Sequence, residues 1–153
     1  MADLYHLGRI LVPVDGSECS RFAAEHATRI AQALGGELIL LHVVDSQVVD
    51  QLAQREDDGE PRVRDRLIEN GRVYLQDVAK LAEARNVPHS EQIQEGDPCS
   101  VICDAAAAAN VNLIVMGKMG RRGARRILVG SITRRVIECS DRAVLVVSAP
   151  PRD

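Results

Sequence analysis

Short apolar runs of strand length alternate with amphipathic stretches of helix length along most of this chain. The runs at 9–14 and 37–44 are rich in Val, Ile and Leu, and the second is apolar at almost every position. Such a run is typical of a strand covered on both faces, as in a parallel sheet. Between the two runs, apolar residues recur at helical spacing over 17–34 and a pair of glycines follows, which predicts a helix with a glycine stop.

The second half of the chain continues this alternation. Asp97 followed by Pro98 is a typical helix start, because the carboxylate caps free amides and proline suits the first turn. The elements expected after residue 62 are a helix at 63–85, a weak polar strand at 89–95, a helix at 97–109, a strand at 111–116, a helix at 130–139 and a strand at 143–147.

One segment interrupts the pattern. Residues 45–62 are mostly polar and acidic, and Gly59 and Pro61 lie within them. We therefore expect a surface loop or an irregular excursion there, with charges that serve solvation.

Alternation of strands and helices favours right-handed crossovers, a parallel sheet and helices on both faces. The length of 153 residues suits one domain, so we predict a single α/β domain over 1–153 with a doubly wound, open, parallel five-stranded sheet. Ligands of such folds bind beyond the carboxyl ends of the strands, where the strand order reverses. This places Asp15, Val43 and Gly117 on one rim.

The composition narrows the range of partners. Aromatic residues make up 2% of the chain and Trp is absent, so the stacking platforms of single-stranded nucleic-acid binders are missing. A formal net charge of −3 gives no overall attraction to nucleic acid or to an anionic membrane. Residues 1–7 lack the apolar core of a signal peptide, and the longest apolar runs are far shorter than a membrane span. We expect a cytoplasmic protein that binds neither nucleic acid nor membrane.

Four cysteines occur without a C-x-x-C pair. Cys99 and Cys103 are four residues apart and would share a helix face, which leaves a metal half-site open. Because no His or carboxylate cluster accompanies them in the sequence, we favour buried thiols and assign no metal ligand.

A glycine pattern follows the fourth predicted strand. Gly117 and Gly120 are separated by two residues, and after nine more residues Gly130 and Ser131 open the next predicted helix. Glycines at a strand exit allow a ligand to approach closely and permit positive φ, and a helix N-terminus offers free N–H donors to phosphate. Ser131 and Thr133 add hydroxyl donors. The pattern G-x-x-G-x9-G-S/T therefore predicts a phosphate site that is neither a P-loop nor the dinucleotide fingerprint G-x-G-x-x-G.

With this pattern the chain resembles the universal stress protein family, specifically its ATP-binding branch. The resemblance covers essentially the whole chain and rests on residues 10–17 (ILVPVDGS), 41–43 (LHV), 96–98 (GDP), 128–131 (LVGS) and 144–147 (VLVV). It implies a Rossmann-like, adenine nucleotide alpha hydrolase-like fold with strand order 3-2-1-4-5.

The resemblance also implies a two-ended site for ATP, bound with or without a Mg²⁺ or Mn²⁺ ion. Asp15 and the backbone of Val43 match positions that face adenine, while the glycine pattern and Arg121 match positions along ribose and phosphates. The residues that the resemblance assigns to this site are Pro13, Val14, Asp15, Val43, Met116, Gly117, Gly120, Arg121, Gly130, Ser131, Ile132 and Thr133. It further implies a homodimer joined through the last strand, 142–147, and leaves an unidentified protein partner open.

Other interpretations stay open for several residues. Asp15 could serve merely to cap the first helix or its turn, with no role toward adenine. Gly130 with Ser131 could form an ordinary helix start. His42 lies in an apolar strand and is favoured as a satisfied core or rim histidine over a base or a ligand. Seven cations between 118 and 135 could neutralise triphosphate, bind a polyanion or form a solvated face.

Three functions are compatible with these observations. We favour a nucleotide-responsive regulatory module in a stress response. A slow ATP hydrolase is the second hypothesis. Against it, the sequence shows no obvious carboxylate or glutamine dedicated to the attacking water. A nucleotide-free interaction protein is the third, if Lys118 or Met119 blocks the pocket.

Overall fold

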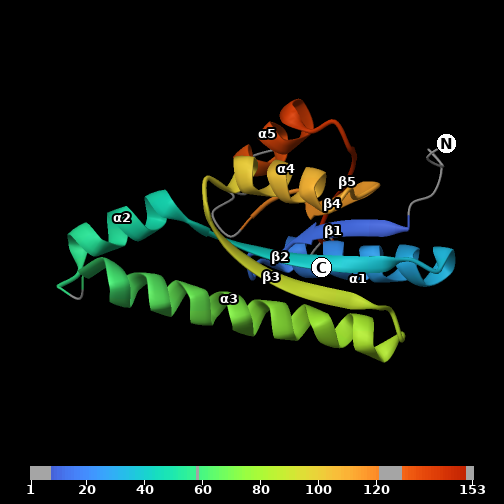
Figure 1. Cartoon of the computed structure of the whole chain (residues 1–153), viewed down its shortest axis with the longest axis horizontal. Helices are drawn as coiled ribbons and strands as arrows, with labels where there is room; N and C mark the ends of the chain where they lie inside the picture. The colour runs from blue at the N-terminus through green and yellow to red at the C-terminus, as the bar shows by residue number, and fades with distance from the viewer. Residues whose placement is uncertain (1–7, 58, 121–128, 151–153) are drawn as a thin grey trace.

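The computed structural model describes residues 8–57, 59–120 and 129–150, and their elements follow the expected alternation of strands and helices (Figure 1). The strands are β1 (Arg9–Pro13), β2 (Glu37–Asp45), β3 (His89–Gly96), β4 (Leu113–Gly117) and β5 (Ala143–Val147). The helices are α1 (Glu18–Leu34), α2 (Ser46–Arg55), α3 (Gly59–Ala84), α4 (Pro98–Ala108) and α5 (Ser131–Cys139).

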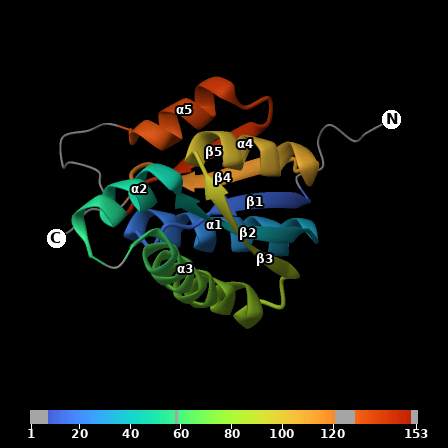
Figure 2. The same ribbon diagram turned by 60° about the vertical axis from the view of Figure 1, so that its left-hand side comes forward.

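The five strands form one parallel sheet in the order β3-β2-β1-β4-β5, which confirms the predicted topology. Figures 1 and 2 show α1 and α3 on one face of this sheet and α4 and α5 on the other. Alternate residues of each strand point to opposite faces, so the sheet supplies two separate cores. Ile10 and Leu40 pack toward α1 and α3, whereas Leu11 and Leu41 pack toward α4 and α5.

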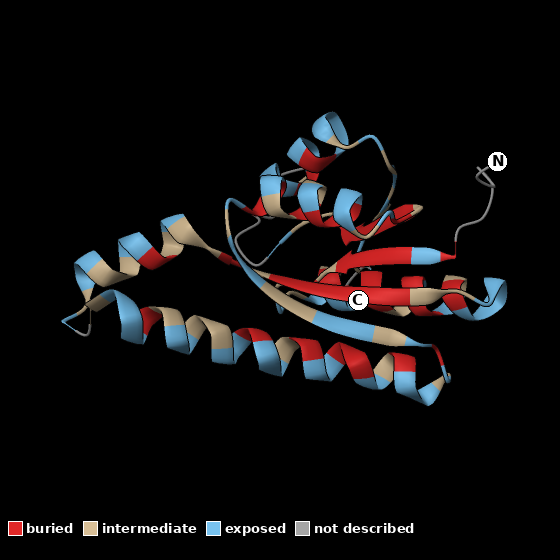
Figure 3. Ribbon diagram, in the orientation of Figure 1, coloured by how far each residue is buried: buried red, intermediate tan, exposed pale blue. Residues whose placement is uncertain are grey.

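Both cores are built from aliphatic side chains, as the composition predicts. Figure 3 shows burial along the middle of β1 and most of β2, and buried stripes along the inner sides of the helices. Small residues of α1 and α4, such as Ala27 and Ala106, are almost fully buried and let these helices approach the sheet closely.

Helix ends follow the capping residues that the sequence indicates. The Ser17 hydroxyl accepts a hydrogen bond from the Ser20 amide at 3.1 Å, and Gly35 ends α1 at a φ of 67°. Asp97 caps α4 by accepting from the Ser100 amide at 3.1 Å. These contacts satisfy amides that have no partner within their own helix.

The expectation of a loop at 45–62 is wrong. Asp45 caps α2 by accepting from the Gln47 amide at 2.9 Å, and α3 begins at Gly59, earlier than expected. Val49 is fully buried and forms a small third core with Val44 and Val63. This apolar contact offsets the polar composition of the segment, because one buried side of a short helix is enough to fix it on a neighbour.

The α2 helix and the first turns of α3 extend past the carboxyl ends of the strands, on the side of the sheet where β2 ends (Figure 1). No helix within the described ranges is both long and apolar enough to cross a bilayer.

Candidate functional site

The regular pairing of β1 with β4 stops before the carboxyl ends of these strands. These two strands are the point where the strand order reverses, and their regular pairing covers only Ile10↔Leu113 and Leu11↔Ile114. Continuing the ladder would require an amide donor at position 13, and Pro13 has none. Pro13 therefore ends the pairing at the position where doubly wound folds bind ligands, the carboxyl ends of the two strands at which the strand order reverses.

The pairing of β1 with β2 ends at almost the same height. The last regular bond runs from the Val14 amide to the Leu41 carbonyl at 2.8 Å. The next bond of the series would join the Val43 amide to the Val14 carbonyl, and the hydrogen bonds of the described chain do not include it. The Val14 carbonyl instead accepts from His42 Nδ1 at 2.7 Å. Val43, which is half-buried, thus lies at the rim beside the open end of β1.

Asp15 is held at this rim by a tight turn. The Ser17 amide donates to Asp15 Oδ1 at 2.9 Å, and Gly16 has a φ of 81°. A Cβ at Gly120 would lie 2.8 Å from the other carboxylate oxygen, Oδ2. The turn after β1 and the turn after β4 therefore meet at the carboxylate of Asp15, and a side chain at position 120 would crowd it.

The three glycines of the motif do not need positive φ, contrary to our expectation. The glycines with positive φ in the described chain lie elsewhere, at Gly16, Gly35, Gly59 and Gly96. Gly117 and Gly120 serve close approach instead, whereas a Cβ at Gly130 would make only ordinary contacts, the nearest at 3.4 Å. A Cβ at Gly117 would lie 2.7 Å from Cys19 Cβ and 3.0 Å from the Ser20 amide nitrogen, because β4 exits directly against the first turn of α1.

The N-terminus of α5 lies at the same end of the sheet as the carboxyl ends of β1 and β4. The Gly130 amide donates to the Lys118 carbonyl at 2.8 Å, and the Lys118 amide donates to the Val147 carbonyl at 2.7 Å. These bonds anchor the start of α5 to the exit of β4. Gly130 is the N-cap residue and has no side chain with which to cap the helix. The first-turn amides and the exposed Ser131 therefore offer donors and a positive dipole end to an anion.

The structure places three further predicted site residues at the end of β4 and the start of α5. Thr133 is buried, and its hydroxyl donates to the Gly117 carbonyl at 2.8 Å, which ties α5 to the end of β4. The side chain of Met116 is buried in the core under α4 and α5, so only its backbone reaches the rim. Ile132 is 37% exposed on the first turn of α5. Arg121 lies outside the described residues.

One cation of the basic cluster has a defined partner away from the crevice. Arg135 forms an ion pair with Asp97 at 3.1 Å and joins α5 to the first turn of α4. The hydrogen bonds from Arg135, followed by those from Ser100, hold the pKa of Asp97 below its ordinary value. Arg135 is therefore a structural residue. Much of the remaining cluster, residues 121–128, lies outside the described ranges.

Burial disfavours the thiolate form of the two cysteines of α4, Cys99 and Cys103, by raising the pKa of each thiol. Burial raises the pKa of the Cys99 thiol to about 11, so it stays protonated at neutral pH. The described residues contain no group of three His, Cys, Asp or Glu side chains that could hold a metal ion.

His42 is a satisfied rim histidine, as favoured from the sequence. Its ring makes an edge-on contact with Tyr74 of α3, with ring centroids 5.6 Å apart. Tyr74 lies within the helix expected at 63–85, and its ring lies under the turn after β1, where a Cβ at Gly16 would come within 2.6 Å of it. Only the three-dimensional structure could reveal this contact.

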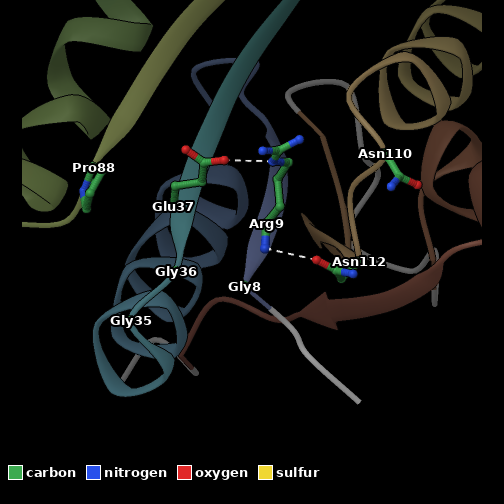
Figure 4. A pocket seen from close by; sticks show the side chains of 8 residues that line it. All are labelled: Gly8, Arg9, Gly35, Gly36, Glu37, Pro88, Asn110 and Asn112. Atoms are coloured by element: carbon green, nitrogen blue, oxygen red, sulfur yellow. Dashed lines mark hydrogen bonds and ion pairs between the residues drawn. The ribbon is translucent and has the colours of Figure 1, made fainter. Parts of the chain in front are cut away.

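A hollow of about 460 Å³ lies at the opposite end of the strands from the candidate site, near their amino ends (Figure 4). Arg9 occupies its centre and donates to Glu37 at 2.6 Å and to the Ala109 carbonyl at 2.8 Å. The Arg9 amide donates to the Asn112 side chain at 3.1 Å. These groups already pair with one another, so the hollow is an open surface between turns.

Comparisons with known proteins agree with this architecture. The model of the universal stress protein family matches residues 6–148. Universal stress protein MJ0531 of Methanocaldococcus jannaschii is 35% identical over 145 residues, which cover 95% of this chain and 84% of that protein. The solved structure of hypothetical protein MJ0577 has a TM-score of 0.84 at 28% identity and covers 96% of this chain and 99% of its own. A universal stress protein solved in complex with cAMP has the same fold, with a TM-score of 0.70 at 22% identity, over 95% of this chain and 99% of its own.

Proposed function

We propose that this chain, which belongs to the universal stress protein family, binds ATP in the crevice at the end of β1 and acts as a nucleotide-responsive regulatory module. The observation that carries the proposal is the opening of the sheet on both sides of β1. Pro13 ends the pairing with β4, and the pairing with β2 stops before Val43. A planar base needs such a gap, because it must reach backbone groups that a continuous sheet would occupy.

The polar groups at the rim suit the edge of an adenine base. Adenine offers a ring nitrogen that accepts a hydrogen bond next to an amino group that donates. The Val43 amide supplies a donor, and the carboxylate of Asp15 supplies an acceptor held in place by the Ser17 amide. A universal stress protein of the same fold binds cAMP, another adenine nucleotide, which supports this choice of ligand class.

The phosphate end of the site is best supported at α5. A glycine N-cap leaves first-turn amides available, and the Ser131 hydroxyl stands beside them. The phosphates would run from the turn at Gly120 to this helix start, with Arg121 near them as the family resemblance implies. We propose ATP over AMP because the motif would supply donors to more than one phosphate.

We also propose that the chain forms a homodimer through β5. This strand lies at the edge of the sheet, is apolar throughout, and leaves Leu145 38% exposed. The other edge strand, β3, carries Glu91 and Glu95, and charged side chains discourage edge-to-edge pairing. A dimer would give nucleotide occupancy a route to the partner subunit, since β5 pairs directly with β4 along Gly117↔Val147.

The proposal is tested by isothermal titration calorimetry with ATP, ADP and AMP, together with phosphate release followed over hours. We expect ATP to bind most tightly and AMP least, with phosphate release close to the rate without protein. No heat of binding at millimolar ATP would refute the proposal and leave an interaction protein. Sustained turnover that Ser131→Ala abolishes would replace it by an ATP hydrolase.

Asp15→Asn provides a matched variant for the base end. The amide oxygen of asparagine can still accept from the Ser17 amide, so the turn is preserved, while the second oxygen becomes a donor that opposes the adenine amino group. We expect ATP affinity to fall by about tenfold or more with little change in melting temperature. Equal losses of affinity and stability would assign Asp15 to the turn alone.

A further inference from the structure

The amides of alternate β2 residues face β1 and form a regular series. The Glu37 amide donates to the Gly8 carbonyl at 2.6 Å, and the register of the two strands repeats this bond every second residue. Val43 is the next member of the series after Leu41. Its amide therefore points toward the end of β1, where the Val14 carbonyl would be its partner in a longer ladder.

His42 takes the place of the Val43 amide as the donor to the Val14 carbonyl. Because the Val14 carbonyl can only accept, the contact at 2.7 Å requires that Nδ1 of His42 carries the hydrogen and donates it. The side chain of His42 points toward α3, on the opposite face of the sheet from the core under α4 and α5. It thus engages the Val14 carbonyl from the α3 face of the sheet, and the described hydrogen bonds include none from the Val43 amide to this carbonyl.

Two residues of α3 fix the ring in this position. Gly71 leaves room for the imidazole, since a Cβ there would overlap the ring. Tyr74 contacts the ring at an interplanar angle of 66° and also fills the space beneath Gly16. One helix therefore holds both the histidine that engages Val14 and the turn that presents Asp15.

We infer that His42 is a positioning residue of the nucleotide site: by engaging the Val14 carbonyl, it leaves the Val43 amide available to an acceptor nitrogen of a purine base. This inference rests on the proposed nucleotide site. It assigns to His42 a role in base recognition without contact with the base. His42 acts on the Val14 carbonyl at the end of β1, and the base accepts the hydrogen bond that the Val43 amide does not make to this carbonyl.

Amide hydrogen exchange in the ligand-free protein tests the structural step. The Val43 amide of the unsubstituted protein should exchange much faster than the Leu41 amide and become protected when ATP binds. In His42→Leu the Val14 carbonyl is released and can accept from Val43, so exchange at Val43 should slow by about tenfold or more. A Val43 amide that is already slow in the unsubstituted, ligand-free protein overturns the inference without need of any variant.

Binding measurements test the functional step. His42→Leu should lose about tenfold or more in ATP affinity and keep its affinity for inorganic tripolyphosphate, which has no base. His42→Asn, whose amide can donate to the Val14 carbonyl, should retain most of the ATP affinity. Equal losses for ATP and tripolyphosphate, or an unchanged ATP affinity in His42→Leu, overturn the inference. Failure of the unsubstituted protein to bind ATP would instead refute the proposed function, and the titration of that protein alone reveals it.

Discussion

Pro13 and His42 affect opposite sides of β1 at nearly the same height. Pro13 has no amide with which to continue toward β4, and His42 engages the carbonyl that would continue toward β2. Each residue is associated with the loss of one regular backbone hydrogen bond, Pro13 toward β4 and His42 toward β2. Together they convert the end of a central strand, normally satisfied on both sides, into a rim with backbone groups that a ligand can reach.

Gly130 permits a substitution that separates helix stability from anion binding. Its φ of −62° and ψ of 151° suit aspartate, and a Cβ there would meet its nearest neighbour at 3.4 Å. Aspartate is also at least as good an N-cap as glycine. We expect Gly130→Asp to keep or slightly raise the melting temperature and to abolish measurable ATP binding, because the carboxylate repels phosphate and occupies the amides.

Gly130→Asn is the control, since it caps the helix without the charge. It should bind ATP more tightly than Gly130→Asp. Equal affinities for the two variants, measured by calorimetry, would place the phosphates elsewhere.

Asp97 gives the protein a defined dependence on acid. Its pKa is lowered by Arg135 and Ser100, so its contribution to stability is complete above the ordinary carboxylate pKa and is lost as the pH falls through the lowered value. We expect Asp97→Asn to be less stable than the unsubstituted protein at pH 5–8, with the difference shrinking below about pH 4. Urea unfolding across this range measures it. A difference that does not change with pH would mean that the ionised carboxylate contributes nothing beyond its shape.

Among the elements of the described chain, the sequence predicted each strand, with β3 only as a weak polar candidate, and each helix except α2. The reason is that burial on both faces of the sheet leaves a strong signal in β1, β2 and β4. The α2 helix escaped notice because most of its residues are polar and only one, Val49, is fully buried. Pairing details were also beyond the sequence. The residues flanking the crevice could be named, but the missing bond to Val43 depends on strand register and on the direction of one imidazole.

Val49 tests whether α2 is a packed helix. Replacing it with alanine removes a fully buried apolar group from the contact with Val44 and Val63, so the free energy of unfolding should fall by about 1–3 kcal/mol. Val73→Ala, at a position 55% exposed on α3, is the matched control and should change it by less than about 0.5 kcal/mol. If both variants have the same stability in urea unfolding, Val49 does not anchor α2.

At the scale of the whole molecule, the sheet is protected on one edge and open on the other. Glu91, Gln92 and Gln94 lie on β3, while β5 carries only Ala, Val and Leu. Since an exposed apolar edge strand is a liability in a monomer, β5 is the natural place for a second copy to dock.

Leu145→Arg should therefore convert a dimer into a monomer in size-exclusion chromatography with light scattering. A charged side chain cannot be buried across an apolar strand pair without a partner. Val73→Arg places the same charge on an exposed apolar position of α3 and should leave the dimer intact. A protein that is monomeric before substitution, or a dimer that survives Leu145→Arg, would contradict the proposed interface.

Binding of ATP at the end of β1 can be tested by titrating ATP into ¹⁵N-labelled protein. The amide signals that shift most should belong to Asp15, Val43, Gly117 and Ser131, at the carboxyl ends of the strands and the start of α5. The absence of any shift at millimolar ATP would contradict it. Shifts gathered around Arg9, at the amino end of β1, would contradict it as well.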